Sequence, residues 1–200
     1  MKFIIGSPPA AELSAPLGQG WQELPGLGGK AVQNYGLAAS GVAALLVGVF
    51  IHWGISPSSL WTAALILVTI LPLHELVHAL FTPAWGLSDR TVIGFQRGKG
   101  LLLPYMYFDG SQPLWRMLLT GLAPLLLLSV LPAVVLRFAP LTDAARADLG
   151  FLSFFNASMS GGDLVVFFWL VTRLPLRAAV KGNGWSLLWK SPADGSARRP

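Results

Sequence analysis

Four long apolar stretches constrain this chain more than any other feature of its sequence. They cover about 36–53, 60–81, 114–138 and 149–170, and charged residues are almost absent from them. About 20 apolar residues in a helix cross the roughly 30 Å hydrocarbon core of a bilayer. Only helices and closed barrels satisfy their backbone groups there. We therefore expect an all-α membrane protein with four transmembrane helices.

The composition supports the same class. Hydrophobic residues make up 54% of the 200 residues and charged residues 12%, whereas a typical soluble domain carries about 25% charged residues. So few polar side chains argue strongly against a water-soluble globule, and a buried soluble helical bundle remains the weaker alternative. Cysteine is absent, which excludes a disulfide scaffold and a cysteine nucleophile.

Basic residues predict the orientation. With four spans, the N-terminus, the 82–113 connection and the C-terminus lie on one side of the membrane. That side would hold every Lys and Arg except Arg137 and Arg146. The positive-inside rule then places both termini in the cytoplasm of a multi-pass cell-membrane protein. The net charge of +5 reflects the basic residues that orient the chain in a lipid bilayer, and we expect no nucleic-acid partner.

Three regions follow from these boundaries. Residues 1–34 are expected to form a cytoplasmic arm, 35–174 the four-helix membrane domain and 175–200 a cytoplasmic tail. Within the domain, two β-prone runs flank the Gly-rich segment 97–100. This pattern predicts a short β-hairpin over about 91–107, at the membrane surface between the second and third helices.

The second apolar stretch contains the motif His74-Glu75-Leu76-Val77-His78. Two histidines four residues apart lie on one helical face and can bind one metal ion. The glutamate between them is displaced around the helix, where it can act on a water molecule beside the metal. The motif therefore indicates a zinc hydrolase with two imidazole ligands and a general base. A His/Glu cluster hydrogen-bonded within the bundle is the structural alternative.

The fourth stretch offers a third ligand. Asp163 is the one acid in the predicted spans besides Glu75, and ionisable residues inside a span usually mark a functional site. The alternative role for Asp163 is to cap a half-helix after Gly161-Gly162. Asn156 lies about two helical turns earlier. It is a candidate catalytic residue that stabilises an oxyanion, or else a polar contact between helices.

These motifs together resemble a known family. His74-Glu75-Leu76-Val77-His78, then Gly86-Leu87-Ser88-Asp89-Arg90-Thr91, then Ser160-Gly161-Gly162-Asp163-Leu164 are similar to the putative zincin peptidases. These are small bacterial membrane proteins whose plan is similar to that of the site-2 proteases. The resemblance covers the first through the fourth stretch. One departure is Leu164, because site-2 proteases have glycine after the liganding aspartate.

The resemblance implies a function for each part of the site. His74, His78 and Asp163 would be zinc ligands, Glu75 the catalytic base, and the hairpin a sheet that receives an unwound substrate strand. We expect a zinc-dependent intramembrane endopeptidase acting on a membrane protein or peptide. Two alternatives remain. One is a non-proteolytic metal-binding scaffold or assembly protein, and the other is a proton or cation carrier that uses the same residues.

Overall fold

The computed structural model describes residues 1–9, 20–24, 29–52, 55–98, 101–184 and 186–191. Its α-helices are α1 (Gly29–Phe50), α2 (Leu60–Phe81), α3 (Leu114–Leu125), α4 (Leu131–Phe138), α5 (Asp143–Met159) and α6 (Gly161–Arg173). Two short helical turns, η1 (Pro83–Gly86) and the π-helical η2 (Leu126–Val130), connect some of them. The strands are β1 (Lys2–Ile5), β2 (Gln22–Glu23), β3 (Thr91–Gly98), β4 (Leu101–Phe108), β5 (Ser111–Pro113), β6 (Ala179–Asn183) and β7 (Ser186–Lys190).

Two of the expected spans are continuous in the structure. Helix α2 has a mean hydropathy of 1.9, and the run Leu114–Phe138, made of α3, η2 and α4, has a mean hydropathy of 2.3. Large apolar side chains on α2 point away from the protein, such as Trp61 at 87% and Val68 at 72% exposed. Such a helix is stable in lipid, where apolar surface needs no protein cover. The chain is therefore an integral membrane protein.

The fourth expected span is broken. Helices α5 and α6 meet at Ser160 with a bend of 51°, and they cross a membrane as one unit only if the bent pair counts as a single span. In α1 the described apolar part is Asn34–Phe50, which is shorter than the other spans. The described residues therefore contain two or three candidate membrane spans, and a fourth stays a prediction.

The expectation of an all-α protein is corrected by two small sheets. Strand β1 pairs in parallel with β3, and β3 pairs with β4 in the predicted hairpin, from Thr91↔Phe108 to Gly98↔Leu101. The second sheet has the order β2-β7-β6-β5. Strands β1, β2 and β5 are short and pair with segments far away in the sequence, so no local pattern predicts them. Strands β6 and β7 pair with each other from Asn183↔Ser186 to Ala179↔Lys190, a local hairpin that the sequence prediction did not include.

Four of the five extra strands fall in the flanking regions of the sequence prediction, and β5 lies within 35–174. Strands β1 and β2 lie within 1–34, and β6 and β7 lie within 175–200. Residues 10–19, 25–28, 185 and 192–200 of those regions lie outside the described residues. Tyr107 connects the two sheets, because its hydroxyl donates a 3.0 Å hydrogen bond to the carbonyl of Gly182. Burial and the nearby Asp109 raise the pKa of Tyr107 to about 12.

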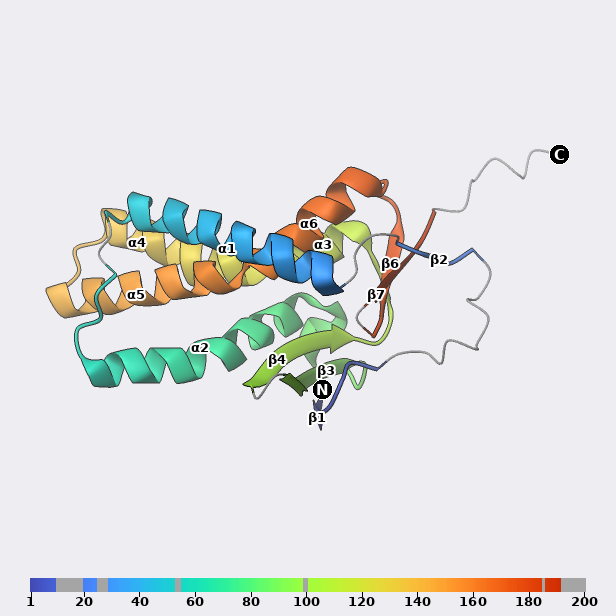
Figure 1. The fold of residues 1–200 in the computed structure, drawn as a ribbon, viewed down its shortest axis with the longest axis horizontal. Helices are drawn as coiled ribbons and strands as arrows, with labels where there is room; N and C mark the ends of the chain where they lie inside the picture. The colour runs from blue at the N-terminus through green and yellow to red at the C-terminus, as the bar shows by residue number, and fades with distance from the viewer. Residues whose placement is uncertain (10–19, 25–28, 53–54, 99–100, 185, 192–200) are drawn as a thin grey trace.

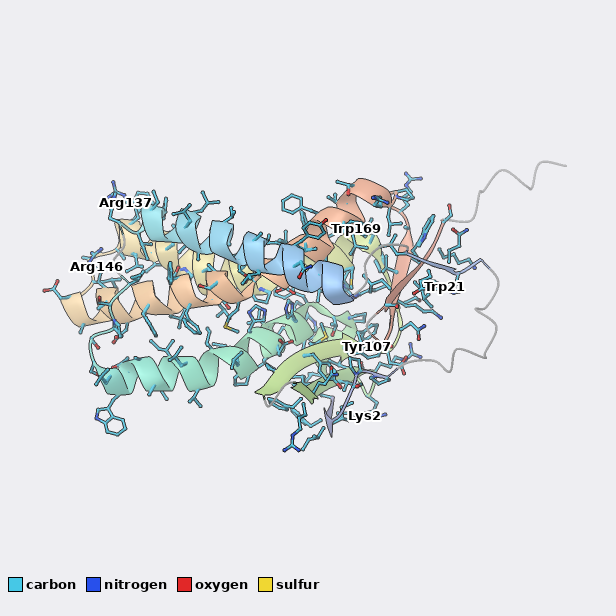
Figure 2. The ribbon with its side chains drawn as sticks, viewed as in Figure 1. Lys2, Trp21, Tyr107, Arg137, Arg146 and Trp169 are labelled. Carbon is cyan, nitrogen blue, oxygen red and sulfur yellow. The ribbon has the colours of Figure 1, made fainter. Side chains whose placement is uncertain are left out.

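The helices and the sheets occupy different ends of the molecule. Figure 1 shows the helices extending along the long axis, with both sheets gathered at one end. Leu114, Leu170 and Val180 are almost completely buried and join α3 and α6 to the second sheet. Arg137 and Arg146 lie at the end opposite the sheets, whereas Lys2 lies at the sheet end (Figure 2). Arg137 and Arg146 are therefore separated from Lys2 along the helices.

Candidate metal centre

Helix α2 brings His74 and His78 together. The residues lie one turn apart on the same face, and their ring centroids are 4.8 Å from each other. Both are buried, with 4% and 7% of their surface exposed. This proximity follows from the α-helical period alone, because residues i and i+4 are neighbours on any regular helix.

Asp163 joins the two histidines from the first turn of α6. One carboxylate oxygen lies 3.1 Å from Nε2 of His74, and the other lies 3.4 Å from Nε2 of His78. One ligand atom from each of the three residues can be chosen so that all lie within 4.8 Å of one another. The structure therefore brings the three predicted ligands into one cluster.

The break between α5 and α6 places Asp163 there. Ser160 ends α5 with ψ at 4°, and its hydroxyl donates a 2.9 Å hydrogen bond to the carbonyl of Asn156. Gly161 begins α6 directly against Gly36 and Ser40 of α1, and a Cβ at Gly161 would overlap both residues. The close crossing of α1 over this glycine fixes the direction in which α6 starts. The position of Asp163 therefore depends on α1 as well as on its own helix.

Each histidine is oriented by a hydrogen bond from its other ring nitrogen. Nδ1 of His74 lies 2.9 Å from Oδ1 of Asn156, and Nδ1 of His78 lies 2.7 Å from the carbonyl of Thr120. Both partners are oxygen acceptors, so in the neutral rings Nδ1 carries the proton and Nε2 keeps its lone pair. Such contacts fix the tautomer and the ring orientation of metal-binding histidines.

Glu75 lies outside this cluster but next to it. Its side chain is partly buried, and its carboxylate lies close to the backbone of Met106 in β4. The predicted base therefore lies on α2, with its carboxylate directed at the β3–β4 hairpin. Asn156, the other predicted catalytic residue, is fully buried and contacts His74.

Sequence reasoning missed the parts of α3 and η2 that support the site. The carbonyls of Thr120 and Pro124 and the hydroxyl of Ser129 all take part in the contacts around the histidines and Asn156. Backbone carbonyls leave no signal in a sequence. Ser129 did offer one, because it is a polar residue between the two prolines that interrupt the third apolar stretch.

The donor set suits a catalytic zinc ion. Two imidazole nitrogens and one carboxylate oxygen form a three-residue set, which leaves a further coordination position for water or substrate. Imidazole and carboxylate ligands also bind iron and manganese. The donor set therefore indicates a divalent transition metal, and zinc is the metal that we expect. Both Nε2 atoms face Asp163 in the orientation that binding requires.

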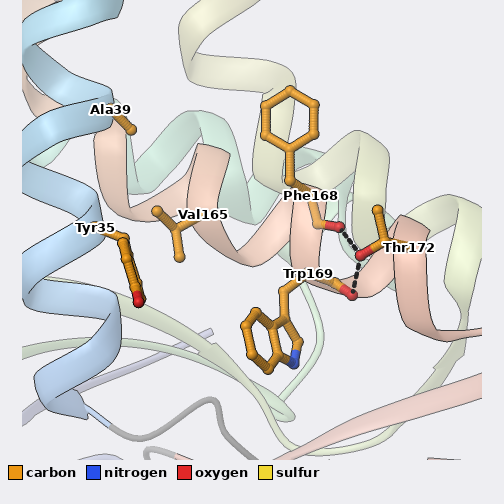
Figure 3. A pocket seen from close by; sticks show the side chains of 6 residues that line it. All are labelled: Tyr35, Ala39, Val165, Phe168, Trp169 and Thr172. Atoms are coloured by element: carbon orange, nitrogen blue, oxygen red, sulfur yellow. Dashed lines mark hydrogen bonds between the residues drawn. The ribbon is translucent and has the colours of Figure 1, made fainter.

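A separate apolar groove of about 300 Å³ lies between α1 and α6. Figure 3 shows its lining residues, Tyr35, Ala39, Val165, Phe168, Trp169 and Thr172. None of them belongs to the histidine–aspartate cluster, and the hydroxyl of Thr172 already donates to the carbonyls of Phe168 and Trp169. We therefore place the chemistry at the cluster and not in this groove.

Comparison with known proteins agrees with this site. A family model described as "Putative zincin peptidase" matches residues 66–178, which is more than half of the chain. The matched segment contains Glu75 and Asn156 as well as the three residues of the cluster. No curated protein and no solved structure matches the chain.

Proposed function

The chain belongs to the putative zincin peptidase family, and from this premise we propose that it is a zinc-dependent intramembrane endopeptidase. Its substrates would be membrane-associated proteins or peptides. The observation that carries the proposal is the convergence of His74, His78 and Asp163 from two apolar segments of the chain. Their ligand atoms lie within 4.8 Å of one another, and a buried group of this kind needs a cation to balance the carboxylate.

The three residues of the cluster would hold the metal. A zinc ion bound there supplies Lewis-acid activation of water and of the substrate carbonyl. Asn156 and the Thr120 carbonyl keep the two imidazole rings turned with Nε2 toward Asp163. The site is mostly buried, and Asp163 retains 27% side-chain exposure. We propose that water enters on the side of this carboxylate.

Glu75 is proposed as the general base. It follows His74 directly and so is displaced by about 100° around the helix, which separates it from the ligand face. The carboxylate takes a proton from water as the water oxygen adds to the peptide carbonyl carbon. It then gives the proton to the amide nitrogen as the C–N bond breaks. Two products leave, one with a new carboxyl group and one with a new amine.

The hairpin is proposed to present the substrate. A transmembrane helix keeps its carbonyls in internal hydrogen bonds, so the segment to be cut has to unwind and extend. Among the described strands, β4 forms the edge of its sheet opposite β1. The backbone of Met106 in β4 touches Glu75, so an extended segment paired with this edge lies next to the base.

We also propose the arrangement in the membrane. The four apolar stretches would cross the cell membrane, with the N- and C-termini in the cytoplasm. The separation of Arg137 and Arg146 from Lys2 along the helices supports this orientation (Figure 2). The sheets and the water entrance would then lie on the cytoplasmic side.

The decisive experiment compares Glu75→Gln with the matched variant Glu23→Gln, which changes an exposed glutamate on β2. Each protein is reconstituted in proteoliposomes with a set of peptides that contain one transmembrane segment each. Products are identified by mass spectrometry and zinc is measured by elemental analysis. We expect Glu75→Gln to keep its zinc and to lose at least about 100-fold in cleavage rate.

The outcomes separate the candidate functions. Cleavage by wild type and Glu23→Gln but not by Glu75→Gln supports the peptidase. Cleavage by Glu75→Gln at the wild-type rate contradicts the role of the base. Bound zinc without any Glu75-dependent product favours the non-proteolytic metal-binding scaffold.

A further inference from the structure

A π-helical turn interrupts the third apolar stretch beside the metal centre. In η2 the backbone N–H of Leu131 bonds to the carbonyl of Leu126, five residues earlier. Pro132 follows and has no N–H to donate. π-helical turns are rare and often occur at functional sites. Here the turn and the preceding Pro124 both contact the side chain of Asn156 on α5.

These contacts use both N–H groups of the Asn156 side chain. Its side chain is completely buried. The amide nitrogen donates one proton to the Pro124 carbonyl at 2.9 Å and the other to the Ser129 hydroxyl at 2.8 Å. A side-chain amide has only two N–H groups, so both are used. The Pro124 carbonyl can only accept, so it fixes which end of the amide is nitrogen, and the Ser129 hydroxyl accepts the second amide proton.

This assignment determines the state of His74. Because Oδ1 of Asn156 can only accept, Nδ1 of His74 is the donor in their 2.9 Å contact. Nε2 of His74 is then left with its lone pair, on the side that faces Asp163. A reversed amide would present N–H groups to the ring and favour the other tautomer. The Pro124 carbonyl prevents this reversal, and the Ser129 hydroxyl holds the amide in place by accepting its second proton.

The backbone of Ser129 makes a second, separate contact with α5. Its carbonyl accepts a 2.7 Å hydrogen bond from the hydroxyl of Ser153. Ser153 lies about one turn before Asn156, and all three side chains are completely buried. Two contacts therefore join the π-helical turn to the same helix. One reaches the metal centre through Asn156, and the other does not.

We propose that the π-helical turn is a positioning element of the metal centre, and that Ser129, together with the Pro124 carbonyl, acts through Asn156 to fix the tautomer and orientation of His74. The proposal rests on the metal site of the proposed function but does not depend on peptidase activity. It gives Asn156 a positioning role, because in the described structure both of its N–H groups are engaged and neither is free to stabilise an oxyanion.

The test compares Ser129→Ala with Ser153→Ala. Both remove one buried hydroxyl between the same two segments, but only Ser129→Ala removes an acceptor of Asn156. Zinc affinity of each purified protein is measured by competition with a chromophoric chelator. Loss of a group that orients a metal ligand typically weakens binding by about 10- to 100-fold. We expect at least about 10-fold for Ser129→Ala and wild-type affinity for Ser153→Ala.

Wild-type affinity in Ser129→Ala overturns the proposal. An equal loss in Ser153→Ala also overturns it, because the effect is then general packing between the helices. Neither measurement uses cleavage, so a protein without peptidase activity still decides the question. Failure of the proposed function is read instead from the Glu75→Gln comparison.

A second measurement uses the wild-type protein, so it does not depend on whether a variant folds. The chain has three histidines, so the zinc-loaded wild type labelled with ¹⁵N-histidine gives a simple spectrum. We expect His74 to coordinate through Nε2, with a slowly exchanging proton on Nδ1. Coordination of His74 through Nδ1 overturns the proposal.

Discussion

The two parts of the chain that build the metal centre are held in different ways. Helix α2 is continuous from Leu60 to Phe81 and carries both histidines on one face. The pair α5–α6 is bent by 51° and carries Asp163 just after the bend. In α2 the spacing of the histidines comes from the helix itself. In α5–α6 the position of the aspartate depends on α1, which packs against the break at Gly161.

The difference shows which part of the site is sensitive to distant changes. The histidine pair needs only an intact helix, together with hydrogen bonds that turn each ring. The position of the aspartate also depends on α1, which crosses α6 at Gly36. The crossing is so close that no side chain fits at Gly161 of α6. We therefore expect substitutions remote from the metal to act mainly through Asp163.

The largest expected effect comes from removing one ligand from each part. His74→Ala and Asp163→Ala should both weaken zinc binding by more than the roughly 100-fold upper range for a supporting residue. Each change removes a ligand atom itself, so a three-residue set is left with two. Metal content after dialysis measures the loss.

Asp148→Ala serves as the control for the aspartate. Its carboxylate oxygens accept two hydrogen bonds of 2.8 Å, from the backbone N–H and the hydroxyl of Ser58, and take no part in the cluster. The variant should keep its zinc. A full equivalent of zinc in Asp163→Ala would break the comparison, because α6 would then contribute nothing to the metal.

A smaller effect is expected at the bend itself. Gly161→Ala introduces a Cβ that overlaps Gly36 and Ser40 of α1, so α1 and α6 have to separate. Overpacking of this kind destabilises by about 1–3 kcal/mol. Zinc binding should weaken as well, because Asp163 lies in the same helical turn. Chemical denaturation and the chelator competition measure the two effects.

Gly162→Ala is the matched control. The nearest atom to a Cβ at that position is Cγ1 of Val32 at 4.0 Å. Alanine should fit there and favour the helix by up to about 1 kcal/mol. If both variants bind zinc as the wild type does, the position of Asp163 does not depend on the α1 crossing.

The smallest effect should follow from the helix caps. The hydroxyl of Ser59 caps α2 by accepting from Thr62, and that of Thr142 caps α5 by accepting from Ala145. Ser59→Ala and Thr142→Ala should each destabilise by about 1 kcal/mol, as measured by thermal unfolding. Both caps lie about 20 Å along their helices from the site. A change in zinc affinity in Ser59→Ala would contradict local control of the histidine pair, which lies on the same helix.

The fold could be predicted where one local pattern was sufficient. The apolar run ending at Phe81 predicted α2, and the two β-prone runs around a Gly-rich turn predicted the β3–β4 hairpin. The parallel pairing of β1 with β3 joins Lys2 to Val92. No window of sequence contains both partners. Gly161-Gly162 did indicate a break in the fourth stretch, but the 51° angle of the bend at Ser160 depends on packing against α1.

The site divides in the same way. The motif from His74 to His78 identified two ligands by spacing alone. Asp163 and Asn156 were selected because polar residues are rare in the spans, which indicated importance without giving their partners. The structure supplies those partners, and Asn156 proves to have both amide protons engaged by Pro124 and Ser129.

By itself the sequence determined the membrane setting and the paired imidazoles. Lipid offers no hydrogen bonds to the backbone, so long apolar runs have to be helical, and the helical period then aligns residues four apart. Only the tertiary structure decided that Asp163, 89 residues from His74, lies 3.1 Å from it. Hydrogen bonds act over about 3 Å, and the packing of α1 against the break in α5–α6 sets distances on that scale.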